Sequence, residues 1–499
     1  MADRIQSQAL RTDATIMCPG STGAPPNRYA DDVASKKRHS GKGKGPRQGI
    51  SGNPQRRAEQ LAQREGEPQG HPLHDLAYAL AGGAEPAPWW GESHRRILAA
   101  ARAVAWPSRP VDLETQACRI VGDEFYERLN SGQSGLHPFQ WLRVLAEKTG
   151  AALRTSVADG TGDWQRLWPL LCGLALTAPP GDTESETARL ARASFPGIKD
   201  PYVTTLAEAG KAAKLLADRG LVSGTGYSAD GCRPTGDPLI ARDAYGSRFL
   251  VVAPFGYDGA ALDHWYAWDI DACWILNVVG AGVFDTAEDA LAEWQHAVGG
   301  AAGTALSPAA PETTSGLLAS CLKTEPLSDM LEGSEPRELI REYYRLRRRA
   351  RVLVGVTAAS AAEVSPGSSD SDAVREAFLD WYQARHDDVP QDTADAADLI
   401  LYEWGPQPHP EECPRYSCSP HRIEMAAHLI RDGYFPDAAN AALRLLPEWT
   451  QWCIEQSGLD ADFAARSRAA VLTEAAALVD EEAHGPAVRQ NEAPFRRQE

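Results

Sequence analysis

The sequence predicts a mostly α-helical, multi-domain protein with a small α+β module and a disordered N-terminal tail. At 499 residues the chain exceeds what one hydrophobic core usually supports, so several folded units of roughly 100–200 residues are expected. Apolar residues recur mostly at helical spacing, and only the stretch from about residue 238 to 284 alternates with a period of two. A polar, glycine-rich segment precedes the first helical pattern.

Residues 1–70 are expected to form the disordered tail, and this tail is strongly basic. Eight basic residues and no acidic residue lie between positions 36 and 57: Lys36, Lys37, Arg38, Lys42, Lys44, Arg47, Arg56 and Arg57. Because the whole chain carries −18 and this segment carries +8, the remainder must carry −26. Such a block either solubilises the chain or binds the phosphates of a nucleic acid.

Residues 71–230 are predicted to be a helical domain. In "SHRRILAAARAVAW" the apolar positions keep helical spacing, and the Trp-Pro pair that follows stops the helix. We expect the next helix to start with Asp112 as its N-cap and another to run from Pro138 to Gly150. A further amphipathic helix covers residues 204–222 and closes at Gly220.

Residues 236–300 are predicted to be a small antiparallel α+β module. Alternating stretches joined by the turn "AYGS" indicate a hairpin, and two more strands follow. The segment "TAEDALAEWQHAVG" then predicts a helix with Thr286 as N-cap and Asp289 in its first turn. This last strand and helix resemble the layout of HicB-type antitoxins, in which a Gly-containing turn precedes a T-x-E-E-A-L helix. The resemblance implies an interaction or RNA-partner module without catalysis.

A linker at 301–335 is expected to lead into an Arg-rich amphipathic helix at 336–356. At helical spacing four arginines form one stripe: Arg337, Arg341, Arg345 and Arg348. The opposite face carries apolar side chains: Leu339, Tyr343, Leu346 and Ala350. We therefore expect the apolar face to dock on a core and the arginines to point outward. Outward arginines either grip phosphates or form a solvated face that neutralises nearby acidic segments.

Residues 373–484 are predicted to form a C-terminal helical bundle, followed by a polar tail at 485–499. One helix should start with Ser419 as cap and Pro420 in its first turn, and should end at Gly433.

Just before this helix, "HPEECPRYSCSPHR" offers four nitrogen or sulfur ligands: His409, Cys413, Cys418 and His421. Four such ligands could hold a structural zinc ion, which is the only cofactor the sequence indicates. The alternative is a loop with free thiols or a reversible Cys413–Cys418 pair, because the spacing is unusually compressed for one tetrahedral site.

Composition restricts the compartment and the partners. A formal charge of −18 repels nucleic acid and anionic membranes on average, so any such contact must be local. No apolar stretch approaches the roughly eighteen residues of a membrane span. The nine cysteines form no regular framework and the first residues lack an apolar signal core, which predicts a cytoplasmic protein. The Ala- and Arg-rich composition is typical of GC-rich bacterial genomes.

The leading functional hypothesis is a non-enzymatic, nucleic-acid-associated accessory protein, such as one of a plasmid, phage or mobile element. The alternative is an acidic scaffold that binds an unidentified protein. A third hypothesis is an enzyme whose site is assembled from residues such as His264, Asp269 and Asp271. On a strand, the two aspartates would share a face with Trp265, where they could hold a hard cation or simply be hydrated.

Overall fold

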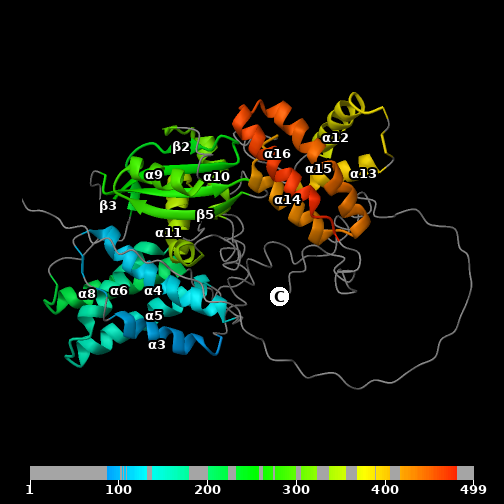
Figure 1. Ribbon diagram of the computed structural model, residues 1–499. Helices are drawn as coiled ribbons and strands as arrows, with labels where there is room; N and C mark the ends of the chain where they lie inside the picture. The colour runs from blue at the N-terminus through cyan, green and yellow to red at the C-terminus, as the bar shows by residue number, and fades with distance from the viewer. Residues whose placement is uncertain are drawn as a thin grey trace, which may run out of the picture. The chain divides into compact units, whose positions relative to one another are not determined.

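The structure is a computed structural model of the chain (Figure 1). It describes residues 87–101, 104, 106–107, 109–131, 138–178, 201–222, 232–257, 262–273, 276–298, 305–322, 336–355, 368–387, 389–390, 392–404 and 416–479. The predicted tails, 1–70 and 485–499, lie outside these residues. The described part is mostly helical with one small antiparallel sheet, which confirms the predicted fold class.

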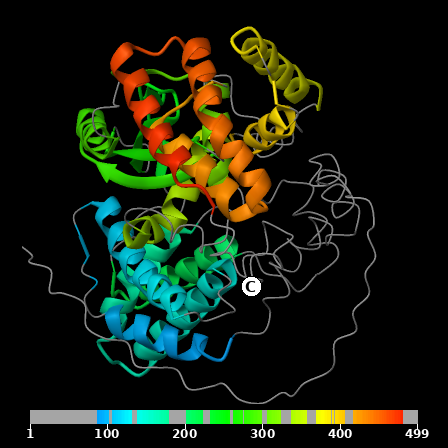
Figure 2. The same ribbon diagram turned by 45° about the vertical axis from the view of Figure 1, so that its right-hand side comes forward.

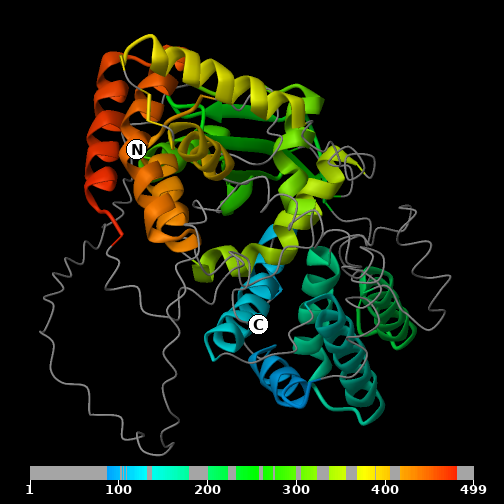
Figure 3. The ribbon, with the colours of Figure 1, turned by 90° about the vertical axis from the view of Figure 1, so that its right-hand side faces the viewer.

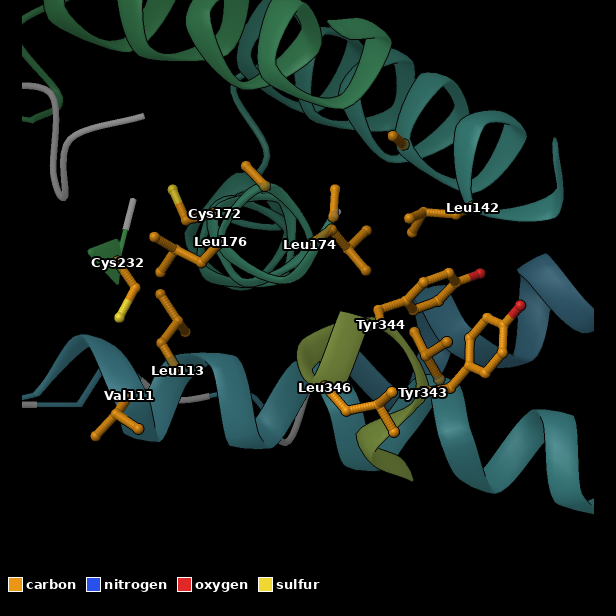
Figure 4. Close-up of a cluster of buried hydrophobic side chains, with 14 of the residues drawn as sticks. Val111, Leu113, Leu142, Cys172, Leu174, Leu176, Cys232, Tyr343, Tyr344 and Leu346 are labelled. Atoms are coloured by element: carbon orange, nitrogen blue, oxygen red, sulfur yellow. The ribbon is translucent and has the colours of Figure 1, made fainter. Parts of the chain in front are cut away.

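Five helices build the N-terminal part of the described chain. They are α3 (Trp90–Ala100), α4 (Pro110–Asn130), α5 (Pro138–Ala158), α6 (Trp164–Thr177) and α8 (Pro201–Asp218). Helix α6 contacts α4, α5 and α8, and every residue from Leu167 to Thr177 is buried. Figure 4 shows its side chains between Leu113 of α4 and Leu142 of α5. A helix that is apolar all round is thus the centre of this group.

Several predicted helix ends were wrong. Helix α3 ends at Ala100, before the Trp-Pro pair at 106–107 that was expected to stop it, and α8 begins at Pro201 and not at residue 204. Helix α4 begins at Pro110, two residues before Asp112, because proline suits the first helical turn and Arg109 is the extended residue before it. Helix α5 continues past Gly150 to Ala158. Gly150 faces α8, where an added Cβ would overlap the Glu208 carboxylate, so a larger residue would disturb the bonds of Glu208 with Arg154 and Lys211. Gly220 follows α8 with a φ of 63°, as expected of a glycine that ends a helix.

The sheet is antiparallel throughout. Its strands are β1 (Cys232–Pro234), β2 (Leu239–Arg242), β3 (Arg248–Tyr257), β4 (His264–Asp271), β5 (Asn277–Phe284) and β6 (Ser307–Pro308). The strand order is β5-β4-β3-β2-β6, and β1 also pairs with β3. Helix α9 (Ala287–Val298) packs on one face through Ala287, Ala290 and Trp294. The Thr286 cap is confirmed, since its Oγ1 accepts a bond from the Asp289 backbone nitrogen at 3.0 Å.

The other sheet face belongs to the same hydrophobic core as the N-terminal helices. Tyr266, Trp268 and Ile270 of β4 face this core, as the alternation along the strand predicts. Helices α10 (Pro311–Leu322) and α11 (Pro336–Val354) contact the sheet on this side (Figure 1). Helix α10 lies within the predicted linker, so part of that linker is folded. Its Leu317 and Leu318 are fully buried, which explains why the segment is ordered.

The last five helices have a core of their own. They are α12 (Ser368–Gln383), α13 (Thr393–Trp404), α14 (Pro420–Gly433), α15 (Pro436–Ser457) and α16 (Ala461–Ala476). Helices α14, α15 and α16 pack side by side (Figures 2 and 3). The predicted cap is confirmed, because the Ser419 side chain accepts a bond from the Arg422 backbone nitrogen at 3.2 Å. Among the described helices, none combines the length and the apolar character that crossing a membrane requires.

The crossing of α4 and α11 makes a testable prediction about stability. Gly122 of α4 lies against the α11 backbone, where an added Cβ would be 2.8 Å from the Arg341 nitrogen. Gly122→Ala should therefore lower the free energy of unfolding by about 1–3 kcal/mol, because the two backbones must separate. Urea denaturation of the purified variant measures this change.

The matched control is Gly210→Ala in α8, where an added Cβ meets nothing within 4 Å. Alanine there should raise the free energy of unfolding by about 0.5–1 kcal/mol, because it restricts the unfolded chain. Equal effects of the two substitutions would contradict the close approach of α4 and α11.

Candidate functional site

The Arg-rich helix α11 has no outward basic stripe. Every residue from Glu342 to Ala350 is buried. The expectation that Arg345 and Arg348 point outward was therefore wrong. The physical reason is that α11 contacts α4 and α6 as well as β1 and β5, so its middle has no face toward solvent. Spacing identified which arginines share a face, but it did not reveal that this face is covered.

Each of these two arginines has hydrogen-bond partners inside the protein. The Arg345 Nε donates to the Glu342 carboxylate at 2.7 Å, and its Nη1 donates to Thr115 Oγ1 at 2.8 Å. Arg348 Nη1 donates to the carbonyl oxygens of Ala175 and Ala178 at 2.9 and 2.7 Å. These carbonyls belong to the last turn of α6 and the residue after it, where backbone oxygens lack helical partners and the helix dipole is negative.

Arg349, which the sequence analysis did not single out, forms the deepest ion pair. Its Nη2 donates to Glu114 of α4 at 2.6 Å and to the Tyr257 hydroxyl of β3 at 3.1 Å. Neither charged side chain has any solvent exposure. The available signal was the triplet Arg347–Arg349, because three consecutive residues of a helix cannot all lie on one exposed face.

The two arginines near the start of α11 are paired at the protein surface. Arg337 and Arg341 both donate to Asp123 of α4 at 2.8 Å. The Arg337 side chain is 46% exposed and that of Arg341 is 18% exposed. A role for either in nucleic-acid binding stays a prediction. The basic residues from Lys36 to Arg57 lie outside the described residues.

The three residues of the enzyme hypothesis do not meet. His264 is buried on the face of β4 that belongs to the main core, with its ring stacked on Phe255. Burial, and then the Arg349 guanidinium, lower the pKa of His264 to about 2. Asp269 lies on the opposite face, where it binds Arg248 at 2.6 Å and accepts a bond from Trp294 at 3.0 Å. Asp269 is therefore occupied by an ion pair and does not join Asp271 around a cation.

The predicted zinc ligands are divided. His409 and Cys413 lie outside the described residues. Cys418 is buried in the core of the C-terminal bundle, and its carbonyl accepts a bond from Ser467 Oγ at 2.6 Å. His421 instead contacts the sheet, with its Nε2 3.2 Å from the Asp271 carboxylate. The structure thus gives His421 different neighbours from those its sequence position suggested.

Asp271, Cys273 and His421 form a compact group at the contact between the sheet and α14. Their potential ligand atoms all lie within 4.8 Å of one another. Although burial opposes it, the hydrogen bond from His421 lowers the pKa of Asp271. The same bond raises the pKa of His421, and burial raises that of the Cys273 thiol. An oxygen, a sulfur and a nitrogen ligand in one place are what a transition metal such as zinc prefers.

The backbone around this group is held from two directions. The Asp271 carboxylate accepts a bond from the Cys273 backbone nitrogen at 2.6 Å, which fixes the turn after β4. Arg422 of α14 donates to the carbonyls of Cys273 and Ala272 at 2.7 and 2.8 Å. Sequence reasoning missed the group because His421 lies 148 residues after Cys273 and 150 after Asp271; the short D-x-C pattern at the end of a strand was the only local signal.

No protein-family model matches the chain, and searches of curated proteins and of solved structures find no match either. The resemblance of β5 and α9 to HicB-type antitoxins stays a prediction from the sequence.

The buried pair of Arg349 and Glu114 predicts a large effect of one small substitution. Glu114→Gln keeps the shape but leaves Arg349 buried without its counter-charge, so the free energy of unfolding should fall by about 3–5 kcal/mol. Urea denaturation measures it. As a control, Asp218→Asn removes an exposed pair with Lys214 and should change stability by less than about 0.5 kcal/mol. A Glu114→Gln effect as small as that of the control would contradict a buried pair.

Two buried histidines predict how stability depends on pH. His94 and His264 have pKa values lowered to about 4 and about 2, below the 6.5 of an unfolded histidine. The unfolded chain therefore gains protons below pH 6.5 that the folded chain does not. Stability should fall below that pH by about 1.4 kcal/mol per unit for each histidine. Urea denaturation at pH 7.5, 6.5 and 5.5 tests this, and titration of either ring between pH 5 and 7 by NMR would overturn it.

Proposed function

We propose that this protein is a non-enzymatic, nucleic-acid-associated accessory protein that binds the phosphate backbone through its basic segment, residues 36–57. The observation that carries the proposal is the separation of charge along the chain. Eight positive charges lie within this segment without an acid, whereas the rest of the chain carries −26. The segment lies outside the described residues, and its charge alone supports the proposal.

Two features of the folded part support this assignment. The arginines in the middle of α11 have internal partners, so this part of the helix does not offer a second basic surface. Residues 368–479, which contain the C-terminal bundle, carry 20 acidic and 8 basic residues. Such a surface repels phosphates, and the attraction must come from the basic segment. Contacts of this kind set affinity but carry little sequence specificity.

The test is fluorescence-anisotropy binding of mixed-sequence DNA and RNA over a salt series. The full chain should bind with an affinity that falls steeply with salt. Its log–log slope should reach at most about −7 on duplex DNA if all eight charges contact phosphates. A variant with the eight lysines and arginines replaced by glutamine should lose this binding.

Two controls separate charge from other causes. A chain with the sequence of residues 36–57 scrambled keeps the charge and should bind as the original does. Lys214→Gln removes an exposed, paired cation of α8 and should leave the salt slope unchanged. Absence of binding, or binding that ignores salt, would overturn the proposal and favour the acidic scaffold, whose protein partner would then be sought by co-purification.

A further inference from the structure

The group of Asp271, Cys273 and His421 joins two parts of the chain that have separate hydrophobic cores. Asp271 ends β4, whose inner face belongs to the core of the N-terminal helices. His421 lies in the first turn of α14, whose apolar side chains belong to the core of the bundle. The contact between the two cores at this point is therefore polar.

The chemistry of the three donors suits one class of ion. Zinc binds thiolate sulfur, imidazole nitrogen and carboxylate oxygen, whereas calcium and magnesium prefer oxygen alone. A thiolate on Cys273 and the Asp271 carboxylate together carry two negative charges, which a divalent cation balances. A buried group with no net charge avoids the cost of an isolated buried ion.

The geometry is close to what such an ion requires. In a tetrahedral zinc site, bond lengths of about 2.0–2.3 Å separate neighbouring ligand atoms by roughly 3.3–3.6 Å. The Asp271 and His421 ligand atoms are already 3.2 Å apart, and all three lie within 4.8 Å. Small side-chain rotations therefore complete the arrangement.

The surroundings hold these ligands in place and leave one side open. The Cys273 backbone nitrogen orients the Asp271 carboxylate, and Ser419 Oγ lies 3.4 Å from the Cys273 sulfur. Such outer partners orient metal ligands and tune their affinity. The His421 side chain is 54% exposed, so an ion and a water molecule can reach the group from solvent.

We propose that Asp271, Cys273 and His421 bind a zinc ion that ties the end of β4 to the start of α14, with a water molecule as the fourth ligand. This site differs from the loop site that the sequence suggested, since it shares only His421 with that loop. On binding, the Cys273 thiol releases its proton to solvent, because zinc binds the thiolate.

The test is cobalt(II) titration of the full chain after removal of metals by a chelator. One cobalt ion per chain should bind, with the visible spectrum of a tetrahedral site and a sulfur-to-cobalt charge-transfer band. Zinc should displace it. Cys273→Ser should abolish the charge-transfer band, and Asp271→Asn or His421→Gln should weaken binding at least about tenfold.

The matched control is His428→Gln, which removes another exposed histidine of α14 that pairs with Asp432. This variant should bind cobalt as the original chain does. His421→Gln changes a half-exposed side chain, so it should fold even where a change at buried Cys273 reduces stability. Thermal unfolding of each metal-free variant verifies that it is folded.

A second measurement tests the proposed tie between the sheet and the bundle. Zinc should slow hydrogen exchange at Ala272, Cys273 and the first turn of α14 in the original chain, but not in His421→Gln. No stoichiometric cobalt binding would overturn the proposal. So would a charge-transfer band that survives Cys273→Ser and disappears in Cys413→Ser, because the metal would then belong to the loop. Nucleic-acid binding through residues 36–57 should be unchanged in Cys273→Ser, so the two proposals can fail separately.

Discussion

The fold depends on a charged helix, α11, whose middle from Glu342 to Ala350 has no face toward solvent. A buried arginine destabilises a protein by several kcal/mol unless an anion and further hydrogen bonds surround it. For Arg349 these partners come from three elements: Glu114 of α4, Tyr257 of β3 and His264 of β4. The N-terminal helices and the sheet must therefore assemble around α11 together, which explains why they share one hydrophobic core.

This constraint also determines where positive charge is available for function. The arginines in the middle of α11 pair with internal acids or donate to helix-end carbonyls, so they do not offset the negative charge at the surface. The bundle adds further acidic residues. Residues 36–57, by contrast, contain no acid that could serve as a partner within the segment, which is the basis for proposing that phosphates bind there.

Local chemistry was sufficient to predict some features and not others. The caps at Thr286 and Ser419 follow from a side chain that satisfies a nearby backbone nitrogen, so the sequence carries the whole signal. The alternation along β4 is equally local. The role of Gly150 was not predictable, because a glycine that ends a helix and one that faces a neighbouring helix look alike in sequence. The burial of α11 and the approach of His421 to Asp271 depend on contacts with segments that are distant in the sequence. The periodicity of a local stretch carries no information about such contacts.

The contact between the sheet and the bundle is where an added ligand would matter most. Each side has a core that shares no buried residue with the other, and an edge-on contact between the rings of Tyr245 and Phe463 of α16 is one apolar link between them. What joins them near α14 is polar: the bonds from Arg422 to two carbonyls and the pair of His421 with Asp271. A partly exposed ion pair contributes only about 0–1 kcal/mol. A metal ion held by ligands from both sides would make this contact depend on metal concentration, since an ion that binds only the joined state stabilises that state by mass action.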